Sequence, residues 1–79
     1  MKLGRNDMRA LHFLIVTANS KKIATPGMLA SHLKISTAST TKLLDRLERG
    51  GHITRSIHPE DRRAIALAIT PETHEAVMQ

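Results

Sequence analysis

Hydrophobic residues recur at helical spacing along the first half of the chain. Leu11, Ile15 and Ala18 fall on one side of a helix that Asn6 can cap, and the polar residues 19–22 end this pattern. The spacing therefore predicts a first amphipathic helix between positions 6 and 18.

Two more helices follow, separated by a tight connection. Thr25–Pro26 is typical of a helix start, because threonine caps free amides and proline lacks the amide that the first helical position leaves unpaired, so a second helix should end near Lys34. The Ser36 hydroxyl can accept a hydrogen bond from a free amide of a third helix, residues 37–49. Gly50–Gly51 ends this helix, because glycine tolerates the left-handed conformation.

The third predicted helix, residues 37–49, has two chemically different faces. At 100° per residue, one face gathers Thr40, Leu43, Leu44 and Leu47, which should be buried. The opposite face is small, polar and basic, and it consists of Ala38, Ser39, Lys42, Arg46 and Arg49. Asp45 and Glu48 come late in the helix, where they can pair with Arg49 or another neighbour.

After residue 52 the hydrophobic period changes to two, which predicts a β-hairpin. Residues 53–57 form the first strand, and residues 58–61 suit a type I turn with proline at its second position. The buried side of the second strand is expected to be Ile65, Leu67 and Ile69.

Thr70 and Pro71 repeat the start signature and predict a last helix from Pro71 to about Met78. The expected fold class is mainly α with a small β-hairpin (α+β). Two short helices joined by a tight turn, followed by a hairpin, are the pattern of a winged helix-turn-helix. The 79 residues are expected to form one such DNA-binding domain, residues 1–79.

Charge narrows the class of partner. The formal net charge is +5 and the pI is near 10.5, with no acidic residue between positions 8 and 44, which indicates a polyanion binder rather than a protein-interaction module of the same fold. Phe13 is the only aromatic residue of the Phe, Tyr and Trp set, so base stacking with single strands is disfavoured and double-stranded DNA is favoured. The absence of cysteine, of a long apolar run and of a secretory signal predicts a cytoplasmic protein without a membrane segment.

A helix that enters the major groove needs small and hydrogen-bonding side chains where it meets bases and phosphates. The predicted contacts from this region are Lys34, Ser36, Thr37, Ser39, Thr41, Lys42 and Arg46. The hairpin turn, residues 58–63, is named the wing, and its Arg62 and Arg63 suit the negative potential of a minor groove. Asp61 is expected to support the wing by holding the Arg63 side chain in one rotamer.

Three stretches carry a resemblance to a known family: TPGMLASHLKIS (25–36), STTKLLDRLERGGHITR (39–55) and PEDRRAIALAITPE (59–72). The last contains Asp61-x-Arg63 followed by Leu67-x-Ile69-Thr70. The chain resembles the MarR type of bacterial transcriptional regulators. The resemblance implies a ligand-responsive repressor that binds a pseudo-palindromic operator as a homodimer.

Family members usually carry dimer-forming helices before and after this core. Those helices are absent or cut short here, so the homodimer is expected of the full-length protein. Lys42 stands where the family commonly has arginine, which favours phosphate over guanine as its target. The five histidines show neither a metal-binding spacing nor a catalytic arrangement, so no metal, no cofactor and no enzymatic activity are expected.

Overall fold

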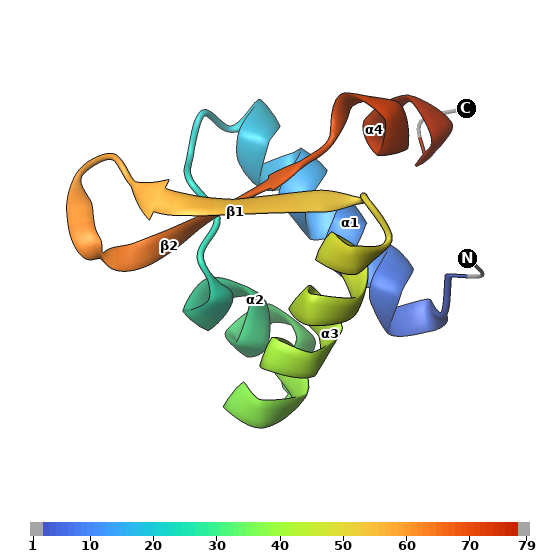
Figure 1. Cartoon of the computed structure of the whole chain (residues 1–79), viewed down its shortest axis with the longest axis horizontal. Helices are drawn as coiled ribbons and strands as arrows, with labels where there is room; N and C mark the ends of the chain where they lie inside the picture. Colours follow the sequence, from blue (N-terminus) through green and yellow to red (C-terminus); the bar gives the residue numbers. More distant parts are fainter. Residues whose placement is uncertain (1–2, 78–79) are drawn as a thin grey trace.

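The computed structural model describes residues 3–77, which fold as a winged helix (Figure 1). The elements in chain order are α1 (Arg5–Asn19), α2 (Pro26–Leu33), α3 (Thr37–Arg49), β1 (Ile53–His58), β2 (Asp61–Ile69) and α4 (Pro71–Val77). The predicted α+β class, the order of elements and the bounds of the third helix are confirmed. Met78, where the last helix was expected to end, lies outside the described residues.

Side-chain caps define the starts of the helices. The Thr25 hydroxyl accepts a hydrogen bond from the Met28 amide at 3.3 Å, and the Ser36 hydroxyl accepts one from the Ser39 amide at 3.1 Å, as predicted. The predicted Asn6 cap is wrong, because α1 begins earlier, with Gly4 at the cap position. The Asp7 carboxylate instead accepts the Gly4 amide at 2.8 Å.

Residues in the left-handed conformation end the helices. Gly51, at φ 77°, follows α3 as the sequence predicts, since glycine has no Cβ to strain there. Lys21, at φ 59°, and Lys34, at φ 57°, take the same conformation after α1 and α2. Any side chain at such a position carries a steric cost. Lys34 therefore has an unfavourable backbone conformation at the place where it presents its charge.

The hairpin pairs in one antiparallel register from Ile53 opposite Ile69 to Ile57 opposite Ile65. The extended link between α1 and α2 adds an isolated bridge, in which the Leu67 amide donates to the Ala24 carbonyl at 2.9 Å. This bridge fastens the base of the hairpin to the helices and leaves its outer end projecting away from them (Figure 1).

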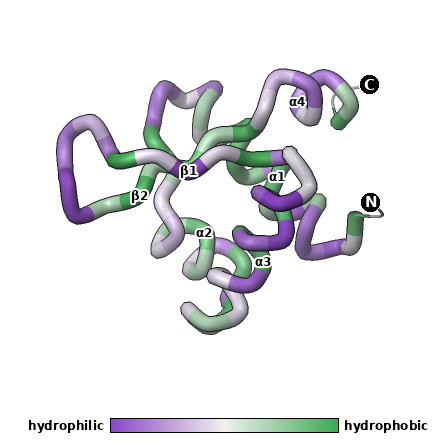
Figure 2. The backbone as a smooth tube through the Cα atoms, in the orientation of Figure 1, coloured by the Kyte–Doolittle hydropathy of each residue, from purple (hydrophilic) through white to green (hydrophobic). Residues whose placement is uncertain are grey.

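The core lies where the three helices meet the base of the hairpin. Leu11, Leu29 and Leu47 are fully buried, and the hairpin adds Ile53 and Leu67. These contacts bury one face of every helix from α1 to α3, which supplies most of the apolar stabilisation of so small a chain. In Figure 2 the projecting hairpin tip and much of α3 are hydrophilic.

The prediction that Ile65 is buried with Leu67 is wrong. Ile65 is 42% exposed and its partner Ile57 is 70% exposed, whereas Leu67 is 6% exposed. The strand is longer than expected and its outer half extends beyond the core, so its alternating pattern continues where no helix covers it.

An ion pair with a buried carboxylate joins α1 to α3. Arg46 donates to the Asp7 carboxylate at 2.6 Å, and the Asp7 side chain is 4% exposed while that of Arg46 is 51% exposed. The Asp7 carboxylate therefore binds both the Gly4 amide at the start of α1 and the side chain of Arg46, which lies 39 positions later in the chain. A carboxylate removed from water in this way depends on its cationic partner.

We expect Arg46→Ala to lower the free energy of unfolding by about 2 to 4 kcal/mol, because it leaves the buried Asp7 carboxylate without a counter-charge. Urea denaturation measures this loss. Arg49→Ala is the matched control, since Arg49 is exposed one turn later on α3, and its loss should stay within about 0.5 kcal/mol. Equal losses in the two variants would contradict a structural role for the pair.

Candidate nucleic-acid interface

The polar face of α3 points outward, as predicted. Thr37, Ser39, Thr41 and Lys42 are exposed, whereas Thr40 is buried and donates its hydroxyl to the Ser36 carbonyl at 2.9 Å. The four predicted inner residues are all buried. The helix therefore presents short hydroxyl side chains and one lysine to an approaching molecule.

The connection between α2 and α3 fixes the start of this face. Lys34 and Ser36 are both exposed there. The Ser36 hydroxyl donates to the Ser39 hydroxyl at 3.0 Å while it caps the Ser39 amide, so the Ser39 proton is free to bond an external acceptor. The Thr41 hydroxyl donates to the Thr37 carbonyl at 3.1 Å, which leaves its lone pairs facing solvent.

On the side of α3 that faces the hairpin, Arg55 of β1 binds both acids of the helix. Its guanidinium group donates to Glu48, with the Nε–Oε1 distance at 3.1 Å, and lies 2.9 Å from Asp45. The hydrogen bond to Glu48 raises the pKa of Arg55, so the group stays charged. This contact neutralises part of the acidic charge beside the polar face.

Sequence reasoning left the partner of Asp45 and Glu48 open, and their partner is Arg55 rather than Arg49. Arg55 faces α3 because it lies near the start of β1, which follows the helix closely in the chain and packs against it. The sequence offered one signal for this contact, which is an arginine in the strand that directly follows a helix with two acidic residues.

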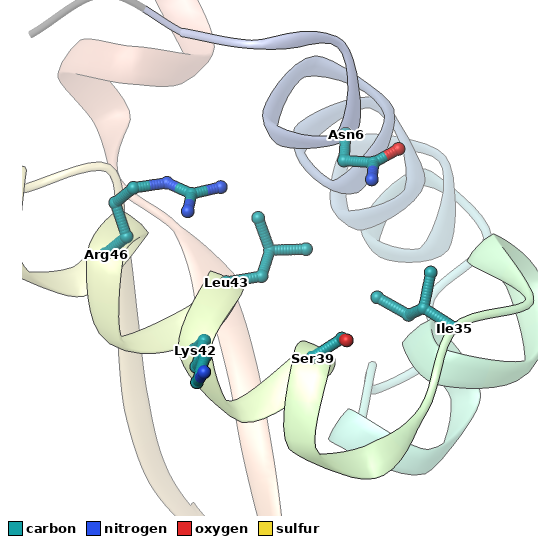
Figure 3. A pocket seen from close by; sticks show the side chains of 6 residues that line it. All are labelled: Asn6, Ile35, Ser39, Lys42, Leu43 and Arg46. Atoms are coloured by element: carbon teal, nitrogen blue, oxygen red, sulfur yellow. The ribbon is translucent and has the colours of Figure 1, made fainter.

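A cavity of about 280 Å³ opens on the other side of α3, toward α1 (Figure 3). We call it the α1-side cavity. Its lining residues are Asn6, Ile35, Ser39, Lys42, Leu43 and Arg46. Figure 3 shows the Arg46 guanidinium group reaching from α3 toward α1, and the Asn6 side chain on α1 at the far side of Leu43. Lys42 and Arg46, both predicted contacts, thus share one surface with a residue that sequence reasoning assigned to a cap.

A second hollow of about 420 Å³ lies between α3 and the hairpin. Thr41 and Leu44 of α3 line it together with Ile57 and Ile65 of the hairpin. The outer half of the hairpin therefore lies beside the polar face of α3, on the side opposite the α1-side cavity.

The wing exposes Arg62 and Arg63 as predicted. Both fall in an irregularity of the hairpin, because His58 pairs with Asp61 whereas the preceding Ile57 pairs with Ile65, so residues 62–64 have no ladder partner. The two wing arginines therefore lie on residues that have no paired residue in the opposite strand.

Asp61 supports the wing in a different way from the one predicted. Its carboxylate accepts the backbone amide of Arg63 at 3.0 Å, and no ion pair joins Asp61 to Arg62 or Arg63 in the described residues. A carboxylate bonds the amide two residues later readily, because a short side chain reaches it without strain. The prediction that Asp61 orients the Arg63 side chain is therefore wrong, and both guanidinium groups remain available.

Between residues 3 and 77, no group of three histidine, cysteine or acidic side chains is arranged to hold a metal ion. The helices of this same segment are all too short or too polar to cross a membrane.

Comparison with known proteins agrees with this architecture. A family model described as MarR family matches residues 2–64. The HTH-type transcriptional regulator BilQ of Clostridioides difficile strain CD3 is 27% identical over 67 residues, covering 85% of this chain and 45% of that protein. The HTH-type transcriptional repressor YetL of Bacillus subtilis strain 168 is 40% identical over 48 residues, covering 61% of this chain and 29% of that protein.

Among solved structures, that of ZitR from Lactococcus lactis, described as a zinc-responsive MarR family member, is 26% identical, with a TM-score of 0.80 over 99% of this chain and 51% of that one. The present chain thus spans about half or less of the length of these three proteins.

We expect Arg55 to couple the hairpin to α3. Arg55→Ala and Glu48→Gln should each destabilise the fold, and a double-mutant cycle in urea should give a coupling free energy of about 1 kcal/mol, because each substitution removes the same contact. Arg62→Ala paired with Glu48→Gln is the control, and these losses should simply add. A zero coupling for the Arg55 pair would contradict the contact.

Proposed function

The chain belongs to the MarR family, and we propose on this premise that it is a transcriptional regulator that binds double-stranded DNA. In this proposal α3 occupies the major groove and the wing, residues 58–63, contacts the adjacent minor groove. The observation that carries it is the outward polar face of α3, flanked by a hairpin that bears two free arginines.

The size of the groove supports the placement of α3. The major groove of B-DNA is about 12 Å wide, close to the diameter of a helix with its side chains. The residues that lead into the groove are then Ser36, Thr37, Ser39, Thr41 and Lys42, whose side chains can form hydrogen bonds with bases and phosphates, as donors or as acceptors. Asp45 and Glu48 lie later in the helix, where Arg55 offsets part of their charge.

Positive charge around this helix supports phosphate contacts. Lys34 is exposed at the end of α2, and Arg46 is half exposed although Asp7 binds one of its nitrogens. The remaining guanidinium donors of Arg46 are free to bind an oxygen. We assign Lys34 and Arg46 to phosphates, which fix the position of the protein and carry no sequence information themselves.

The wing supplies the contacts at the minor groove. Arg62 and Arg63 are exposed, and the bond from the Arg63 amide to Asp61 orients the backbone that carries them. A narrow minor groove concentrates negative potential, which attracts arginine side chains. The wing therefore adds affinity at sequences whose minor groove is narrow.

We further propose that the 79 residues are one domain of a repressor that acts as a homodimer on a pseudo-palindromic operator and responds to a small-molecule effector. The names of BilQ and YetL, as an HTH-type regulator and an HTH-type repressor, support the regulatory part. Two-fold symmetric operators match dimers of helix-turn-helix proteins, one recognition helix for each half-site.

We expect Arg63→Ala to weaken binding to a duplex selected from a random-sequence pool by about 1 to 3 kcal/mol, because it removes a guanidinium from the minor groove. Lys42→Ala should reduce the slope of log affinity against log salt by about one, because one phosphate contact is lost. Gel-shift titrations at several salt concentrations measure both effects.

Arg9→Ala is the control for loss of charge, since Arg9 is exposed in a hollow over α1 and α2 that includes Phe13 and His32. It should leave affinity and slope nearly unchanged. If the unmodified chain binds no duplex even at low salt, the DNA-binding proposal fails and a protein-docking role of the same surface is favoured.

A further inference from the structure

The α1-side cavity contains more hydrogen-bond donors than the described contacts use. Within residues 3–77, Lys42 forms no ion pair. In the same segment no hydrogen bond within the chain uses the Ser39 hydroxyl proton or the Asn6 side-chain amide as a donor, and Arg46 adds a cation whose carboxylate partner is buried beneath it. No acidic side chain lines the cavity.

This donor set selects a class of ligand. Lysine acts as a compact charge with three donors, and serine and asparagine add neutral donors around it. An anionic oxygen satisfies such a set, whereas a base edge needs acceptors as well as donors in a fixed plane. The cavity therefore fits a phosphate group.

The position of the cavity identifies which phosphate. A helix that fills the major groove faces a sugar–phosphate backbone along each of its two flanks. The hairpin and the acids held by Arg55 occupy one flank of α3, and the α1-side cavity occupies the other. The unoccupied backbone lies on the side away from the wing.

We propose that the α1-side cavity binds a backbone phosphate of the strand opposite the wing, and that Asn6 of α1 contacts this phosphate together with Lys42 of α3. This inference rests on the proposed function and adds to it a third contacting element, α1. Asn6 was expected to cap the helix, and its position past the cap leaves its amide free for this contact.

Asn6→Asp tests the proposal, because it replaces a donor with a negative charge in nearly the same volume. We expect affinity for a short mixed-sequence duplex to fall about tenfold at low salt. An acid in the first turn of a helix is favourable, so the urea midpoint should not fall. Lost binding with retained stability separates a contact from a structural role.

Asn19→Asp is the matched control, since Asn19 is exposed at the far end of the same helix. Its affinity should stay within about twofold of the unmodified chain, as expected for a surface site away from the interface. Combining Asn6→Asp with Lys42→Ala should cost less than the product of the two single losses, because both act on one phosphate. Combining Asn6→Asp with Arg63→Ala should give the full product.

A direct readout comes from the two asparagines of the chain, Asn6 and Asn19. In a chain labelled with ¹⁵N-asparagine, duplex addition should shift the side-chain amide signals of Asn6 and leave those of Asn19 in place. If the duplex binds and the Asn6 signals and affinities do not change, the α1-side site is overturned while the proposed function stands. If the unmodified chain binds no duplex, both are overturned.

Discussion

Burial of a few leucines at one point determines which surfaces of this protein are free. Leu11, Leu29 and Leu47 come from three different helices and are completely covered, and the base of the hairpin covers them further through Leu67. A chain of this size has no second core with which to orient its elements. Each helix must therefore give its apolar face to the same centre, and the hydroxyl and basic side chains of α3 are left on the outside by that requirement.

Polar contacts then set what lies on either side of α3. Toward α1, the buried Asp7 carboxylate holds Arg46, and toward the hairpin, Arg55 holds Asp45 and Glu48. The two contacts have opposite consequences for the surface, because one secures an exposed cation and the other offsets exposed acids. Positive charge consequently remains near the first turns of α3 and toward α1, which is the distribution that a polyanion requires.

The elements could be predicted because their signals are local. Caps at Thr25 and Ser36 and the period of the leucines depend only on neighbouring residues, and they gave the bounds of α3. The Asn6 cap and the Asp61 bond were wrong because other local bonds form there, whereas elsewhere distant parts of the fold decide the outcome. Asp7 finds Arg46 across the fold, and Ile65 stays exposed because no helix reaches the outer hairpin. The predicted site residues are all exposed. The position of Asn6 at the α1-side cavity and the contact of Arg55 with two acids could not be predicted, because both depend on how the elements pack.

The two sides of the interface differ in mechanical character. The α1 side includes an ion pair between two packed helices whose carboxylate is buried, so Arg46 is held in place there. Residues 62–64, which include both wing arginines, have no partner in the hairpin register, and a local bond joins the Asp61 carboxylate to the Arg63 amide. A change of curvature at residues 62–64 therefore separates none of the residue pairs of the hairpin register. Under the proposed function, one DNA backbone would contact the α1 side, where Arg46 is held, and the other would contact the wing, whose curvature could follow the width of the minor groove.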